Sequence, residues 1–78
     1  MVTPEQIRSY IEEGLDCDEL SVTGDGEHFE AFIVSGAFRG KSRVQRHQLV
    51  YAALGDRMRG EIHALSMRTL TPEEAANG

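Results

Sequence analysis

The chain has 78 residues and a single cysteine, Cys17. A lone cysteine can form neither an internal disulfide nor a cysteine-rich zinc site. A chain this short must therefore hold its fold by burying apolar side chains, which favours one domain over residues 1–78 rather than two. At about 0.05–0.15 kcal/mol per residue, the expected free energy of unfolding is about 4–12 kcal/mol.

The N-terminal segment has the pattern of a helix start. Thr3 can cap the helix, Pro4 suits the first helical position, and Glu5 places a carboxylate in the first turn. We therefore expect a helix over about 4–14, with Gly14 at its end and apolar residues at helical spacing: Ile7, Tyr10, Ile11 and Leu15.

A β-hairpin is predicted next. The β-prone segments 20–23 and 28–35 flank the turn Gly24-Asp25-Gly26. The glycines Gly36 and Gly40 then favour a strand-to-helix turn rather than a phosphate-binding loop, because they lack the spacing of such a motif.

The second half predicts a helix over about 42–58, closed by Gly60, and a third strand over 62–70. In that strand Leu65 and Met67 alternate with the smaller Ala64 and Ser66. One face of the helix carries the predicted apolar stripe: Val44, His47, Val50, Tyr51, Leu54 and Met58.

Residues 71–78 repeat the cap pattern of the N-terminus and predict a short last helix that frays. The complete order is α-β-β-α-β-α. A helix between the second and third strands implies a crossover connection. The sequence therefore predicts an α+β fold with a three-stranded mixed sheet and helices packed on one face.

Charge is unevenly distributed along the chain, whose net charge is -5. Residues 1–36 carry nine acidic side chains and one basic one, Arg8, whereas residues 37–59 carry six basic side chains against Asp56. This basic band is either a solvated helix face or a surface for an anionic partner. Its members are Arg39, Lys41, Arg43, Arg46, Arg57 and Arg59.

Candidates for chemistry are few, and no catalytic motif is present, so we do not expect an enzyme. His28 opens a strand beside a flexible turn and is expected to be exposed. His47 is either a hydrogen-bonded core histidine or a neutral metal ligand, because a helix N-terminus and nearby cations disfavour its imidazolium form. We interpret His63 as structural. Cys17 is interpreted as an unreactive bystander, since neighbouring acids raise its pKa.

The first residues contain no basic, apolar leader, and no apolar run approaches the roughly 20 residues that a membrane span needs. We therefore expect a cytoplasmic protein without a membrane partner.

Four motifs in this order resemble the BolA family over nearly the whole chain: Phe38-Arg39-Gly40-Lys41-Ser42, the run 46–51, Ile62-His63-Ala64-Leu65 and Thr69-Leu70-Thr71-Pro72. The segment 24–29 is similar to that of short BolA-like proteins with a histidine at the head of the second strand. The resemblance implies a fold like a class II KH domain. The Gly-x-x-Gly loop of KH domains is replaced here by the wider Gly36 to Gly40 spacing, which argues against RNA binding by that route.

The resemblance also implies a partner and a cofactor. A monothiol glutaredoxin with glutathione and a BolA-like protein share a bridged 2Fe-2S cluster, and no cluster is expected on the isolated chain. Carried over by residue, the ligands would be His47 and His28, a Rieske-like pair of imidazoles on one iron. The flanking Arg39, Lys41, Arg43 and Arg46 would meet an acidic partner face or glutathione carboxylates.

The family resemblance leaves a second function open, namely transcription regulation through DNA binding by the basic central helix. The acidic remainder of the surface opposes that alternative. The free chain is expected to be a monomer or a weak dimer.

Overall fold

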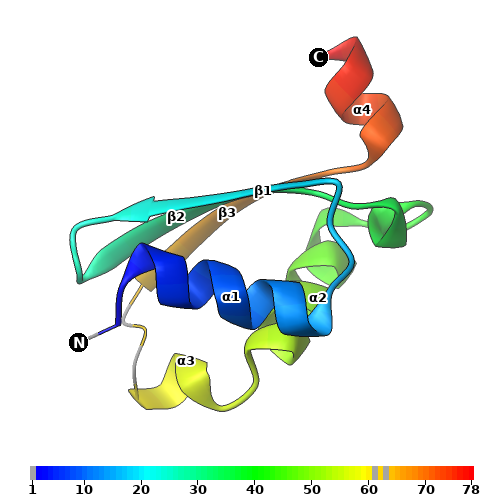
Figure 1. Ribbon diagram of the computed structural model, residues 1–78. Coiled ribbons are helices and arrows are strands. Elements are labelled where there is room, and N and C mark those ends of the chain that lie inside the picture. Colours follow the sequence, from blue (N-terminus) through cyan, green and yellow to red (C-terminus); the bar gives the residue numbers. More distant parts are fainter. Residues whose placement is uncertain (1, 61, 63) are drawn as a thin grey trace.

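The computed structural model describes residues 2–60, 62 and 64–78 (Figure 1). The elements follow the predicted α-β-β-α-β-α order, with two short helical segments added. They are α1 (Pro4–Gly14), β1 (Glu19–Gly24), β2 (His28–Val34), the 3₁₀ turn η1 (Gly36–Phe38), α2 (Arg43–Leu54), α3 (Arg57–Gly60), β3 (Ala64–Leu70) and α4 (Pro72–Asn77).

The three strands form one mixed sheet in the order β1-β2-β3. The pair β1–β2 is antiparallel and the pair β2–β3 is parallel, with His28 opposite Ala64 and Val34 opposite Leu70. Helices α1 and α2 lie against the same face of the sheet, and α4 extends from the far end of β3 (Figure 1). The predicted α+β class and mixed sheet are confirmed.

The core lies between the sheet and these two helices. Phe29, Ala31 and Ile33 alternate inward from β2, as the two-residue period of a strand requires. They meet apolar side chains from the helices and from η1: Ile7, Ile11, Val50, Leu54 and Phe38. The opposite side chains of β2, Glu30 and Phe32, face away from the helices.

The predicted helix over 42–58 is wrong in its extent, because Gly55 divides it. Gly55 has a φ of 61°, a left-handed conformation, and its N–H donates to Tyr51 O at 2.9 Å. This geometry ends α2 at Leu54. Residues 57–60 form the separate α3.

The predicted apolar stripe is also partly wrong. Val50 and Leu54 are buried, His47 and Met58 are half-buried, but Val44 is 65% exposed and Tyr51 is 41% exposed. Because α2 contacts α1 as well as the sheet, its buried face is rotated toward Val50, Ala53 and Leu54.

The strand boundaries differ from those predicted at four positions. Strand β1 extends one residue beyond the predicted 20–23 at each end, and β2 and β3 are each shorter than predicted. Ser35 ends β2 rather than extending it, because its hydroxyl accepts the N–H of Ala37 and donates to Asp16 O at 2.6 Å. Strand β3 begins at Ala64 rather than at residue 62, although the Ile62 side chain is buried in the core. The expected alternation in β3 is confirmed, with Ser66 exposed and Leu65 and Met67 half-buried.

Candidate functional site

His28 is exposed at the first position of β2, as the sequence predicts. The preceding turn is held by Asp25, whose Oδ1 accepts the backbone N–H groups of Glu27 and His28 at 2.9 Å. These hydrogen bonds lower the pKa of Asp25. Strand alternation places His28 on the same face as Glu30 and Phe32, the face that α1 and α2 leave uncovered.

His47 lies in the second turn of α2 and is half-buried. Its pKa is lowered, first by burial and second by the charge of Arg43. The imidazole is therefore neutral at pH 7 and keeps a lone pair for a metal. The direction of the shift matches the sequence prediction, but burial outweighs the charge effect that the sequence emphasised.

The structure does not bring His28 and His47 together. His28 pairs with Ala64 at the start of β3, whereas His47 lines a groove with residues 67–70 at the end of that strand. At about 3.3 Å per residue, these positions are about 10 Å or more apart along the strand. The structure therefore places the two candidate ligands near opposite ends of the β2–β3 pair.

The sequence predicts a structural role for His63, which lies outside the residues that the structure describes.

The groove beside His47 runs between the start of α2 and the end of β3, with a volume of about 440 Å³. Four of its lining side chains are basic and one, Glu74, is acidic. It therefore presents a net positive surface to solvent. The basic residues are Lys41, Arg43, Arg46 and Arg68.

The basic band does not act as one free surface. Arg39 donates two hydrogen bonds to Glu73, from Nε at 2.9 Å and from Nη2 at 2.8 Å. Arg46 donates from Nη1 to Glu74 at 2.6 Å and from Nη2 at 3.1 Å. Two of the four candidate binding residues thus pair with α4. The other two, Lys41 and Arg43, have no ion pair within the described part of the chain.

Sequence reasoning missed Arg68 and the two glutamates of α4. Arg68 lies nine residues beyond Arg59, the last member of the basic band, in a mainly uncharged segment, so the charge count along the chain did not group it with the band. The helix-cap pattern around Thr71 did place Glu73 and Glu74 in a first turn, yet it carries no signal for their partners.

Acid titration provides a test of the α4 contact. The pKa of Glu74 is lowered from 4.5 to about 2, first because Arg46 hydrogen-bonds to it and second because the Thr71 backbone does. A carboxyl whose pKa is lower in the folded chain stabilises the fold above its ordinary pKa. This contribution is lost as the pH falls from about 5 to 2.

We expect Glu74→Gln to lose less stability than wild type over that pH range, measured by urea unfolding at each pH. Glu30→Gln, on the uncovered sheet face, is the matched control. A pH profile of Glu74→Gln that parallels wild type contradicts the assignment.

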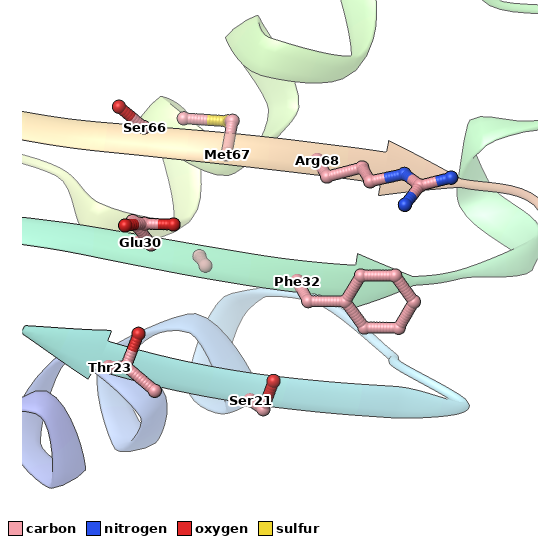
Figure 2. A pocket seen from close by; sticks show the side chains of 8 residues that line it. Ser21, Thr23, Glu30, Phe32, Ser66, Met67 and Arg68 are labelled. Atoms are coloured by element: carbon pink, nitrogen blue, oxygen red, sulfur yellow. The ribbon is translucent and has the colours of Figure 1, made fainter.

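The uncovered sheet face has a shallow hollow of about 340 Å³ (Figure 2). Two cross-strand rows line it, one of Ser21, Phe32 and Arg68 and the other of Thr23, Glu30 and Ser66. Figure 2 shows Phe32 and Arg68 extending toward the same end of their strands, and the guanidinium carbon lies 6.0 Å from the ring centre.

Cys17 is half-buried, and burial followed by the charges of Asp16, Glu12 and Asp18 raises its pKa. The thiol is therefore poorly suited to act as a thiolate nucleophile or ligand. Its Sγ donates to Leu15 O at 3.5 Å. The predicted direction of the shift is confirmed, with burial as its main cause.

Within residues 2–60, 62 and 64–78, no three His, Cys, Asp or Glu side chains gather in a metal-binding arrangement. Among the helices of the same residues, none is long and apolar enough to span a bilayer.

Comparison with known proteins identifies the family. The family model described as "BolA-like protein" matches residues 8–74. A solved bolA homologue from Coxiella burnetii superposes with a TM-score of 0.89 at 47% identity, covering 97% of this chain and 99% of that one.

Curated relatives include the Escherichia coli acid stress protein IbaG, 39% identical over 91% of this chain and 86% of that protein. The Haemophilus influenzae DNA-binding transcriptional regulator BolA is 43% identical over 65% of this chain and 50% of its own length. SufE-like protein 1 of Arabidopsis thaliana is 51% identical over 69% of this chain, which spans only 15% of that protein. The family-model match and the full-length similarities show that this chain belongs to the BolA family.

Proposed function

We propose that this chain is a non-enzymatic adaptor that binds a monothiol glutaredoxin with glutathione and shares a bridged 2Fe-2S cluster, in iron–sulfur trafficking or iron homeostasis. The observation that carries the proposal is His47, a neutral imidazole in the wall of an open, positively charged groove. A neutral imidazole is a common metal ligand. The basic side chains around it suit the carboxylates of glutathione or of an acidic partner face.

The ligand chemistry requires a partner. Fe–S clusters are held by thiolates, with imidazoles replacing two of them in Rieske centres. This chain has only one cysteine, and its pKa is raised. The thiolates must therefore come from glutaredoxin and glutathione, while this chain supplies imidazole.

His47 and His28 are the proposed ligands. Because they lie apart in the structure, we assign them different roles. We assign His47 to the stable shared cluster because of its neutral state and its place in the groove. His28, exposed on the other face of the sheet, is assigned to a transient contact during transfer.

We expect His47→Ala to abolish the stable shared cluster and leave the far-UV circular dichroism unchanged. The test is anaerobic reconstitution with a monothiol glutaredoxin, glutathione, iron and sulfide, followed by visible circular dichroism and EPR. Gln48→Ala, at the next and exposed position, is the matched control. His28→Ala should retain the cluster and slow its transfer.

Unchanged cluster absorbance and coordination in His47→Ala would contradict the ligand assignment. His63→Ala belongs in the same series, because His63 precedes Ala64 in the sequence and Ala64 pairs with His28. If only His63→Ala alters the spectrum, the adaptor role stands and the imidazole ligand is His63 rather than His47.

DNA binding is the second candidate function, supported by the basic groove and by the similarity to the DNA-binding transcriptional regulator BolA of Haemophilus influenzae. It is distinguished by the salt dependence of DNA affinity, whose slope falls by about 0.9 for each lost phosphate contact. Arg43→Ala and Arg68→Ala are the informative variants, with Arg8→Ala on α1 as control. Arg46 is unsuitable because its guanidinium also binds backbone carbonyls.

A further inference from the structure

Helix α4 is attached mainly by charge. None of its residues is fully buried, and its capping box is internal to the segment 71–74. Its carboxylates Glu73 and Glu74 form two-point contacts with Arg39 and Arg46, at donor–acceptor distances from 2.6 to 3.1 Å. The Arg39–Glu73 pair is exposed on both sides, and Glu74 is 46% exposed in its pair with the more buried Arg46. Carboxylates this accessible to solvent form weak ion pairs in water, so α4 can be displaced at low cost.

Arg46 is held in place independently of α4. Its Nε donates to Lys41 O at 2.9 Å, and its Nη1 also donates to Thr69 O at 3.1 Å. Only 14% of its side chain is exposed. When Glu74 leaves, these backbone contacts keep the guanidinium oriented, so its position is prepared for another carboxylate.

We propose that Arg39 and Arg46 form a docking surface for two neighbouring carboxylates on an acidic segment of a partner protein, and that α4 occupies this surface in the free chain. Partner docking then displaces α4. The chain's own Glu73 and Glu74 show the geometry that such a segment adopts, and the nearby Lys41, Arg43 and Arg68 add charge complementarity. The inference deepens the proposed function, on which it rests for the identity of the partner.

Competition between α4 and the partner for this surface has a measurable consequence. If the surface is free in only a fraction of the molecules, the apparent affinity for the partner is reduced in proportion to that fraction. The double variant Glu73→Gln/Glu74→Gln weakens the α4 contact, while glutamine at position 74 preserves the capping box. We expect this full-length variant to bind an acidic peptide about 10-fold more tightly than wild type.

The probe is a peptide with the sequence of residues 71–78, blocked at both ends and titrated by NMR. Glu12→Gln/Glu13→Gln removes the same charge elsewhere and should leave the affinity within about 2-fold of wild type, since these groups are distant from the surface. Adding Arg39→Ala to the Glu73→Gln/Glu74→Gln variant should abolish the gain. Equal affinity of wild type and that double variant, or a gain that survives Arg39→Ala, overturns the proposal.

Hydrogen exchange separates this inference from the proposed function. We expect the backbone amides of residues 73–77 in the wild-type chain to exchange faster once the cluster-bearing glutaredoxin complex has formed. A complex that forms while these amides stay equally protected overturns the docking surface and leaves the adaptor role standing. If no complex forms but the peptide binds as predicted, the docking surface stands and the glutaredoxin function fails.

Discussion

Replacing Phe29 by alanine is expected to lower the free energy of unfolding by about 3–5 kcal/mol. Phe29 is 1% exposed and lies on β2, the central strand, facing the helices. Its truncation removes a large apolar side chain and leaves a cavity that the neighbouring Ile7, Ile11 and Leu54 cannot fully close. A loss of this size is a large part of the total expected for a chain of this length. Urea unfolding followed by far-UV circular dichroism measures it.

Phe32→Ala is the matched control, because Phe32 lies on the same strand with its ring on the uncovered face beside Arg68. It is half-buried, so its loss should be clearly smaller. Equal losses for Phe29→Ala and Phe32→Ala would contradict the assignment of the two sheet faces.

Gly14→Ala is expected to lower the free energy of unfolding by about 1–3 kcal/mol. A Cβ at this position would lie 2.8 Å from both Cα and Cβ of Ala53, so α1 and α2 would have to separate. The same urea titration measures the loss. Gly60→Ala is the control, since a Cβ there meets no atom within 4 Å; its effect should stay within about 0.5 kcal/mol. Similar effects of the two substitutions would contradict the close helix contact.

Local signals in the sequence predicted most of the fold. The Thr3 and Thr71 caps appear where the sequence placed them, each with its capping box. The hairpin and crossover also follow the predicted order. The prediction of one helix over 42–58 failed because Met58 continues the helical spacing beyond Gly55, whose positive φ ends α2 at Leu54.

The site was less predictable, because it depends on contacts between distant segments. Arg39 and Glu73 are 34 residues apart, and Arg46 and Glu74 are 28 apart, so no local pattern connects them. The sequence also supplied no register, and the register is what separates His28 from His47. The exposure of His28 and the lowered pKa of His47 depend on local environment, and both were predicted.

Mixing this chain anaerobically with a cluster-loaded monothiol glutaredoxin homodimer and glutathione tests the adaptor proposal most directly. Native mass spectrometry and visible circular dichroism report the composition of the complex and the environment of the cluster. The proposal predicts a one-to-one heterodimer with a single 2Fe-2S cluster and a spectrum distinct from that of the glutaredoxin homodimer. A cluster that stays in the homodimer, with an unchanged spectrum and no bound partner, would contradict it.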